Sequence, residues 1–119
     1  MEITIIKEKK GDLYAINFDK IEFIIKRTYL IYPKNNLERG GHRHKITKQH
    51  LFCLNGSFDF TFYFNDPIES KTLNMSCNYN SNIFIPPDMW HKMSSFSNDC
   101  ILLVVCSEFF DLNDYINEK

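Results

Sequence analysis

Short apolar segments separated by turn residues run through nearly the whole chain. In residues 58–64, four phenylalanines alternate with Asp59, Thr61 and Tyr63, and this period of two predicts a strand with one buried face. Residues 100–106 form an uninterrupted apolar run, which is typical of a strand buried on both faces. Similar segments predict further strands at 3–6, 13–18, 23–32, 49–54, 71–75 and 83–85.

Turn signals separate these predicted strands. Asn55-Gly56 is typical of a tight hairpin, and Pro86-Pro87 ends the segment before it. Only residues 109–117 could form a helix, with Asp111 as its N-cap and Asp114 in its first turn. Many short strands at this spacing predict an all-β sandwich or barrel with a short C-terminal helical segment. Because the sequence has no repeat or linker, we expect residues 1–119 to form a single domain.

Composition limits the possible partners and location. The 119 residues are 44% apolar and 15% aromatic, which is enough for one core. The 14 basic and 15 acidic residues nearly balance, which argues against a general nucleic-acid or membrane binder. The four cysteines form no CxxC pair, so we expect a reduced protein without disulfides. Without a signal-peptide pattern or a membrane-length apolar run, the expected location is cytoplasmic.

A pair of histidines, His42 and His44, carries the clearest chemical signal. On a strand, this spacing points both imidazoles to one face. Such a pair can bind a metal ion or move a proton, whereas the alternative is two solvated loop histidines. A carboxylate at position 49 would complete a metal site, and Gln49 stands there instead. This favours proton transfer without a metal, with a metal-dependent site as the alternative. His50 should face away from Gln49, in a structural or interface role.

Two segments, 42–56 and 80–91, have the spacing of paired sequence motifs. In the first, four residues separate the histidine pair from Gln49 and the segment ends at a glycine; the second ends at a histidine. These spacings resemble the two cupin motifs, with Gln49 in place of Glu, and with Asn80 and Asp88 in place of Gly. The resemblance implies a small antiparallel barrel or jelly roll in which both motifs converge inside.

A closer match involves four short motifs. They are Arg-Gly-x-His-x-His-Lys from Arg39, Leu-Asn-Gly-Ser from Leu54, Trp90-His91, and Asp-Tyr-Ile from Asp114. Over residues 11–116 the chain resembles the nucleotide-sugar 3,4-ketoisomerases of the cupin superfamily. The resemblance implies a homodimeric enzyme without metal or other cofactor that converts dTDP-4-keto-6-deoxyglucose into a dTDP-3-keto-6-deoxyhexose through an enediol. Such enzymes serve the biosynthesis of deoxy-amino sugars for polysaccharides.

The resemblance also implies roles for individual residues. His42 is expected to act as the base, with His44 as its partner in proton transfer. For Tyr29 and Trp90 the alternative is packing in the core, and for Arg39 it is a surface position. A non-catalytic domain that binds a nucleotide sugar is the alternative to an enzyme. The expected substrate-binding residues are Arg27, Tyr29, Arg39, Gln49, Trp90 and His91.

Overall fold

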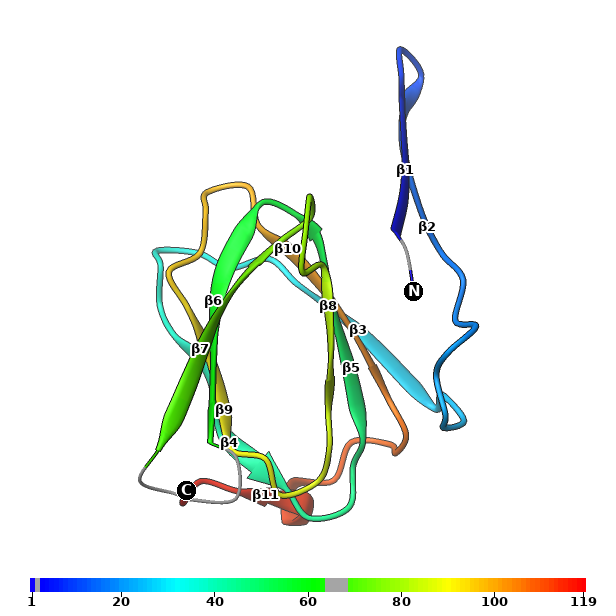
Figure 1. The fold of residues 1–119 in the computed structure, drawn as a ribbon. Helices are drawn as coiled ribbons and strands as arrows, with labels where there is room; N and C mark the ends of the chain where they lie inside the picture. Colours follow the sequence, from blue (N-terminus) through cyan, green and yellow to red (C-terminus); the bar gives the residue numbers. More distant parts are fainter. Residues whose placement is uncertain (2, 64–68) are drawn as a thin grey trace.

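Two antiparallel sheets that face each other form the body of the molecule (Figure 1). The computed structural model describes residues 1, 3–63 and 69–119. One sheet has four strands in the order β3-β10-β5-β8, and the other has five in the order β11-β4-β9-β6-β7. The prediction of an all-β fold is confirmed. The strands are β1 Ile3–Glu8, β2 Gly11–Ile16, β3 Arg27–Ile31, β4 Arg39–His44, β5 Gln49–Asn55, β6 Ser57–Tyr63, β7 Ser70–Ser76, β8 Asn82–Ile85, β9 His91–Ser94, β10 Ile101–Cys106 and β11 Tyr115–Ile116.

The main apolar core fills the space between the two sheets. The alternation along β6 buries Phe58 and Phe60, which pack in one cluster with Leu102 and Val104 of β10. Because successive side chains of a strand point to opposite faces, this alternation leaves Asp59 and Thr61 on the outer side. The strand predicted at 58–64 is therefore confirmed through residue 63, and the fourth phenylalanine lies outside the described residues.

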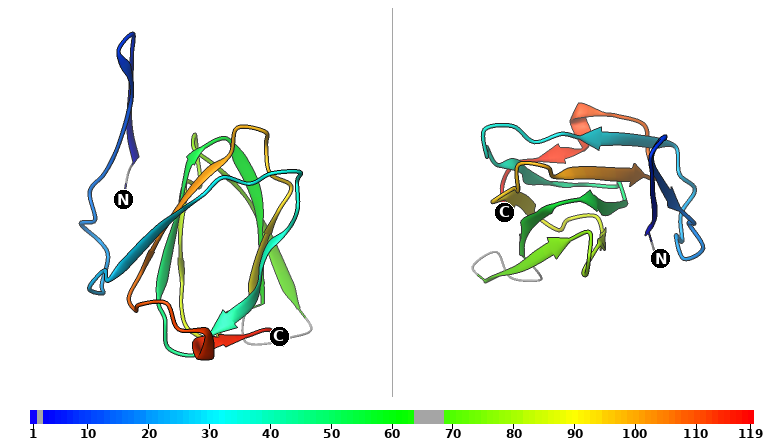
Figure 2. Two further views of the ribbon diagram at one scale, coloured as in Figure 1. Left: turned by 180° about the vertical axis from the view of Figure 1, so that it is seen from behind. Right: turned by 90° about the horizontal axis from the view of Figure 1, so that it is seen from above.

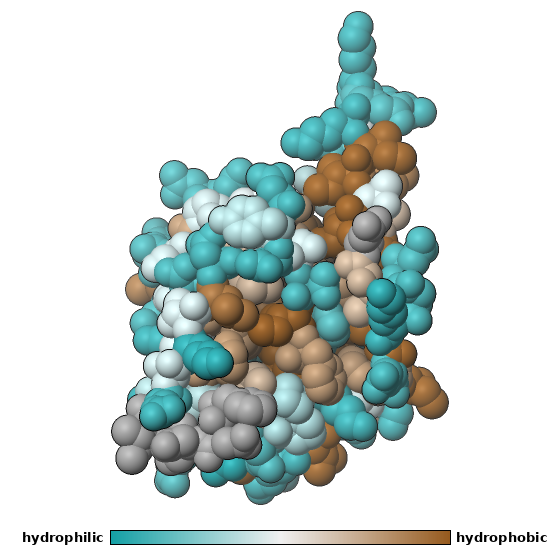
Figure 3. Space-filling view, in the orientation of Figure 1, coloured by the Kyte–Doolittle hydropathy of each residue, from teal (hydrophilic) through white to brown (hydrophobic). Residues whose placement is uncertain are grey.

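A second apolar cluster lies on the outer face of the four-stranded sheet. Phe52 and Leu54 of β5 and Val105 of β10 are buried there under side chains of the first 25 residues, which include Ile3 and Ile16. The β1-β2 hairpin begins at this cluster and then extends away from the body (Figure 2). Figure 3 shows apolar side chains gathered along the hairpin and the neighbouring side of the body. The exposed apolar residues on this side are Ile6 and Leu13 of the hairpin, Leu30 of β3, and Tyr32, which follows β3.

The prediction of a helix over residues 109–117 is wrong. Asp111 does act as an N-cap, since its carboxylate accepts a hydrogen bond from the Asn113 amide, but it caps only a three-residue 3-10 turn, Leu112–Asp114. The chain then becomes extended, and β11 pairs with β4, so that Tyr115 lies opposite His44. Pairing with an open sheet edge satisfies the backbone of this segment, which a short isolated helix would leave largely exposed to water. The C-terminal segment thereby reaches the histidine pair.

Candidate active site

A bulge in β4 sets the direction of the first histidine. Gly40 lies opposite Lys92 of β9 and His42 lies opposite His91, so Gly41 is an extra residue without a partner. The φ angles of Gly40 and Gly41 are 84° and 77°, values that glycine adopts without steric cost. Because residues directly opposite each other in an antiparallel pair share a face, His42 lies on the same side of the sheet as His91. That side is the interior.

Three imidazoles and one phenol form a single cluster between the sheets. The ring centroid of His42 is 5.0 Å from that of His44 and 5.2 Å from that of His91. The Tyr115 ring lies 4.8 Å from His42 and 4.5 Å from His44. The structure therefore brings together the predicted pair, the predicted third histidine, and a tyrosine to which the sequence analysis gave no role.

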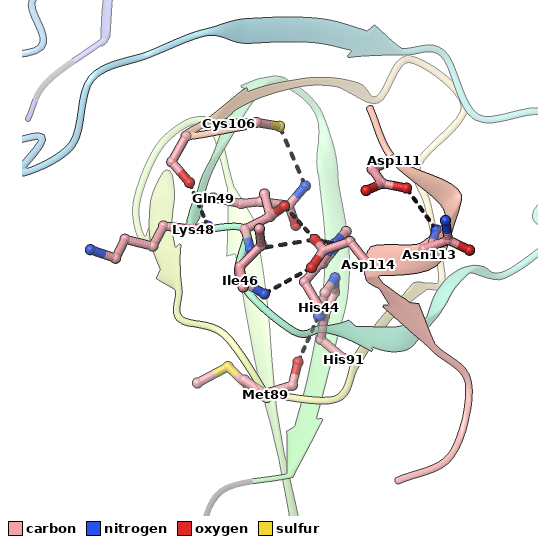
Figure 4. Close-up of polar contacts among 12 residues, drawn as sticks. His44, Ile46, Lys48, Gln49, Met89, His91, Cys106, Asp111, Asn113 and Asp114 are labelled. Atoms are coloured by element: carbon pink, nitrogen blue, oxygen red, sulfur yellow. Dashed lines mark hydrogen bonds and ion pairs between the residues drawn. The ribbon is translucent and has the colours of Figure 1, made fainter. Parts of the chain in front are cut away.

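The second histidine is held by a buried carboxylate (Figure 4). Nδ1 of His44 lies 3.2 Å from Oδ2 of Asp114, and both residues are buried. Oδ1 of Asp114 accepts a hydrogen bond of 2.8 Å from the Ile46 amide. Its Oδ2 accepts further bonds from the amide and the hydroxyl of Thr47. Nε2 of His44 is buried and has no hydrogen-bond partner among the described residues.

The third histidine is fixed by the backbone. Nδ1 of His91 donates a hydrogen bond of 3.0 Å to the carbonyl oxygen of Met89 (Figure 4). A neutral imidazole that donates from one ring nitrogen has its lone pair on the other. Nε2 of His91 is therefore the acceptor nitrogen, and the ring is kept in one orientation.

Burial keeps these imidazoles neutral at ordinary pH. Desolvation lowers the pKa of His42 to about 4, and the neighbouring His44 adds to this effect. Desolvation also lowers the pKa of His91 to about 4. The pKa of His44 is lowered as well, chiefly by burial, although the Asp114 carboxylate acts in the opposite direction. Neutral imidazoles can accept protons, which is the state that a general base requires.

A second polar group lies beside the histidines, at the ends of β3, β5 and β10. The Gln49 amide nitrogen donates to Oη of Tyr29 at 3.1 Å and lies 3.5 Å from Sγ of Cys106. Burial raises the pKa of Tyr29 to about 12, so its phenol keeps its proton. The Arg27 guanidinium lies over the Tyr29 ring, 4.7 Å from the centroid, and over that of Phe110. These side chains offer hydrogen-bond donors and one cation to a ligand beside the histidines.

The described residues do not provide a set of ligands for the alternative, a metal-dependent site. In residues 1, 3–63 and 69–119, no group of three or more His, Cys, Asp or Glu side chains is placed to hold a metal ion. Position 49 would supply the carboxylate of such a site, but its amide nitrogen is directed at Tyr29 and Cys106.

Two of the predicted substrate-binding residues lie apart from this cluster. The Trp90 indole donates to the carbonyl oxygen of Asn117 at 2.9 Å and packs edge-on against Tyr63, so it anchors the C-terminal segment. Arg39 lies opposite Met93 of β9, on the inner face but exposed at the start of β4. Because of the bulge, Arg39 shares a face with His42, whereas in a regular strand two residues three apart would face opposite ways.

His50 lies on the outer face of its sheet, as predicted. It pairs with Phe84 of β8, and its Nε2 lies 2.8 Å from the Asn82 side-chain oxygen. Its ring packs against that of Phe52 in a tilted arrangement, with centroids 4.9 Å apart. The residue therefore has a structural role on the side away from the histidine cluster.

The contacts of Asp114 and Tyr115 with His44 were not predicted from the sequence. Both residues belong to the Asp-Tyr-Ile motif, but they were expected to lie in a helix over residues 109–117. The Asp114–His44 contact joins residues 70 positions apart, and no local pattern shows such a pairing. The available signal was the Asp-Tyr-Ile motif itself, which is part of the family resemblance.

Several known proteins are similar to this chain in sequence or in structure. The family model FdtA, described as WxcM-like, C-terminal, matches residues 1–119. A TDP-4-oxo-6-deoxy-alpha-D-glucose-3,4-oxoisomerase from Aneurinibacillus thermoaerophilus is 37% identical over 115 residues, which are 95% of this chain and 81% of the relative. The 3,4-ketoisomerase QdtA of Thermoanaerobacterium thermosaccharolyticum was solved as a variant with TDP-4-keto-6-deoxyglucose. It is 35% identical, with a TM-score of 0.78 over 98% of this chain and 83% of that one. The TDP-quinovose 3,4-ketoisomerase WlaRB of Campylobacter jejuni is 32% identical, with a TM-score of 0.76 over 98% and 88% of the two chains.

Proposed function

The chain belongs to the FdtA family, and from this premise we propose that it is a sugar 3,4-ketoisomerase that converts TDP-4-keto-6-deoxyglucose into a TDP-3-keto-6-deoxyhexose. The names of its relatives support this substrate, since one is a TDP-4-oxo-6-deoxyglucose oxoisomerase and another was solved with the keto sugar. The product would serve the biosynthesis of deoxy-amino sugars for polysaccharides.

The observation that carries the proposal is the cluster of neutral imidazoles beside two half-buried phenols, Tyr29 and Tyr115. Moving a ketone to the neighbouring carbon requires the removal of an acidic C–H proton and its return one carbon further on. It also requires hydrogen-bond donors for the oxygen that becomes negatively charged. His42 and His44 supply proton acceptors at a centroid distance of 5.0 Å, and Tyr29 keeps its phenolic proton because its pKa is raised to about 12.

The reaction then needs two proton transfers and no oxidant or reductant. His42 takes the proton from C3, the C–H electrons form the C3–C4 double bond of an enediolate, and the π electrons of the C4 carbonyl move onto the C4 oxygen. His44, as its partner, takes the proton from the C3 hydroxyl oxygen and gives it to the C4 oxygen. The C3 ketone forms, and His42 returns its proton to C4. Bonds broken and formed balance, because only the positions of two hydrogens change.

The remaining polar residues are assigned to binding. The Arg27 guanidinium suits the diphosphate, since arginine binds phosphate oxygens in a bidentate manner. Tyr29, Gln49 and His91 surround the sugar in this proposal, and the exposed Arg39 contacts the ligand from the end of β4. The position of Trp90 supports a structural role instead, because its indole nitrogen is already bonded to Asn117.

Product analysis by NMR tests the function. Incubation of the protein with TDP-4-keto-6-deoxyglucose should give new sugar signals of a 3-keto product, and the H4 coupling constant gives its configuration. The variant His42→Asn should lose activity by roughly 10²–10⁴-fold, the usual contribution of a general base, while it still binds TDP. His50→Asn is the matched control, since His50 lies on the outer face of its sheet, and should keep its activity. Unchanged turnover in His42→Asn would remove His42 from the mechanism, and TDP-sugar binding without conversion by the wild type would indicate a binding domain.

We further propose that residues 1–119 act as one cupin domain within a cytoplasmic homodimer. Four free cysteines support a reducing compartment. No helix among the described residues is long and apolar enough to cross a membrane. The exposed apolar residues of the hairpin, of β3 and just after β3 support association with a second copy of the chain through this side; Leu30 is 49% and Tyr32 is 60% exposed.

A further inference from the structure

Resting on the proposed isomerase function, we propose that Asp114 is a positioning residue that keeps the proton of His44 on Nδ1, so that Nε2 is the atom that accepts and passes on the hydroxyl proton. Asp114 does not touch the sugar in this proposal. It acts through His44, whose ring and tautomer it fixes. Neither the fold nor the spacing of the histidines would by itself choose between the two nitrogens.

The tautomer follows from the hydrogen bonds around the carboxylate. Asp114 is 6% exposed and His44 is 3% exposed, so water does not take part in their contact. Oδ1 of the carboxylate accepts a hydrogen bond from the Ile46 amide, and Oδ2 accepts from both the amide and the hydroxyl of Thr47. A carboxylate with this many donors is ionised and can only accept. Nδ1 of His44, 3.2 Å from Oδ2, must therefore carry the proton.

The other nitrogen is left with its lone pair in the interior. Nε2 of His44 is buried without a hydrogen-bond partner among the described residues, although burying a polar atom without a partner is normally unfavourable. The rings of His42 and Tyr115 lie within 5.0 Å and 4.5 Å of the His44 ring. An orphaned acceptor kept at this cost within a polar cluster fits a group that is completed by the substrate.

The electrostatic environment supports the same assignment. Burial by itself would raise the pKa of Asp114, but hydrogen bonds from Thr47 and Ile46, with His44 beside them, lower it overall. The carboxylate therefore stays charged when His44 takes up a proton at Nε2 and becomes an imidazolium. The O–H bond of the C3 hydroxyl breaks, an N–H bond forms, and the oxygen electron pair becomes the new C=O bond as the electrons of the C3–C4 double bond take the proton from His42 to form the C4–H bond. Release of the proton from Nε2 to the C4 oxygen restores the neutral ring.

A purely structural role for Asp114 must be separated from this positioning role. The residue also connects the loop after β4 to the C-terminal turn, because its carbonyl oxygen accepts from the Lys45 amide. Its neighbour Asp111 provides a matched control. Asp111 has the same charge and belongs to the same turn, but its carboxylate bonds only to Asn113 in the described residues. Loss of a carboxylate from this turn can thus be compared with and without the contact to His44.

The decisive experiment combines imidazole NMR with kinetics for wild type, Asp114→Asn and Asp111→Asn. Two-bond ¹H–¹⁵N spectra should show the Nδ1–H tautomer of His44 in wild type and in Asp111→Asn. In Asp114→Asn the side chain loses the negative charge that holds the proton on Nδ1, so the share of the Nε2–H tautomer should rise. Turnover of TDP-4-keto-6-deoxyglucose should then fall by about 10²–10⁴-fold, with TDP affinity unchanged and Asp111→Asn near wild type.

Three results would overturn the inference. These are an Nε2–H tautomer in wild type, full activity in Asp114→Asn, or equal losses in Asp114→Asn and Asp111→Asn. The wild-type spectrum needs no variant, so the inference can be tested even if Asp114→Asn does not fold. Failure of the proposed function has a different signature: wild type would not convert the sugar at all, whatever the tautomer of His44.

Discussion

At the scale of single residues, the amide of Gln49 favours a histidine cluster that transfers protons over one that binds a metal ion. A carboxylate there would add a negative charge to three imidazoles and favour a metal ion. The amide of Gln49 instead donates to the phenol of Tyr29, so that the phenolic proton is available to another acceptor. The sequence predicted the loss of the anionic ligand at this position. It could not predict the partner, because Tyr29 lies on a different strand and 20 residues away.

The buried histidines should make the protein less stable in acid. Burial lowers the pKa of His91 to about 4, whereas an unfolded histidine has a pKa of about 6.5. Between these values the unfolded chain binds more protons, so the free energy of unfolding should fall as the pH is lowered from about 6.5 to about 4. His91 should contribute roughly a few kcal/mol to this fall. Urea unfolding of wild type and His91→Gln across this pH range measures it, and the variant should show the shallower dependence. Equal pH dependence in both proteins would show that His91 is not held neutral by the fold.

At the scale of elements, the backbone conformation explains two substitutions in the second cupin-like segment. Asn80 and Asp88 stand where the motif has glycine, and their φ angles are 46° and 66°. Asn and Asp are the non-glycine residues that adopt this left-handed conformation most readily. Asp88 in addition pairs with Arg43 at 3.0 Å. The backbone geometry of the motif is therefore kept without its glycines.

The strands were predictable from periodicity, and the exceptions have physical reasons. Residues 49–54, 58–63 and 100–106 have clear apolar patterns and lie in β5, β6 and β10, although β10 begins one residue later than predicted. β9 was missed, because its four residues, His91–Ser94, are mixed in polarity. They are held by β4 and β6 on either side. Of the strand predicted at residues 23–32, only Arg27–Ile31 is a strand in the structure. Tertiary pairing decides such short segments more than local propensity.

The two glycines of the β4 bulge should differ in their tolerance to substitution. A Cβ atom on Gly40 would lie 3.0 Å from the His91 carbonyl oxygen and 3.2 Å from Cα of Lys92, whereas on Gly41 it would meet nothing closer than 3.9 Å. Both positions have positive φ, which costs a non-glycine residue about 1–2 kcal/mol. Gly41→Ala should therefore destabilise by about this amount, and Gly40→Ala by more, since backbone atoms must also move. Urea unfolding of both variants gives the comparison. Equal losses of stability would contradict the close contact at Gly40.

At the scale of the whole molecule, the exposed apolar side predicts self-association. Leu30 is 49% exposed on the outer face of β3, near the hairpin, and Leu37, 67% exposed, lies in the loop before β4. Wild type should elute as a dimer in size-exclusion chromatography with light scattering. Leu30→Arg should shift it towards the monomer, because a buried unpaired charge opposes association. Leu37→Arg is the control and should leave the dimer intact. A monomeric wild type, or equal effects of the two variants, would contradict an interface on this side.

Local features of the molecule could be predicted from the sequence, whereas a contact between distant segments could not. The all-β fold and the facing of His42 and His44 follow from local spacing, which the sequence carries directly. The contact between Asp114 and His44 depends on where a chain segment 70 residues later returns to the sheet, and this is set by the closure of the barrel. The helix prediction failed for the same reason, since β4 offered an open edge to residues 115–116.

The most direct test of the central claim, a ketone moved by proton transfer between neutral histidines, is a time course of ¹H NMR in D₂O with TDP-4-keto-6-deoxyglucose. We expect loss of the substrate H3 signal and growth of a 3-keto sugar whose C4 position carries solvent deuterium, because protons held on imidazoles exchange with water. An unchanged substrate spectrum in the presence of folded, TDP-binding protein would contradict it.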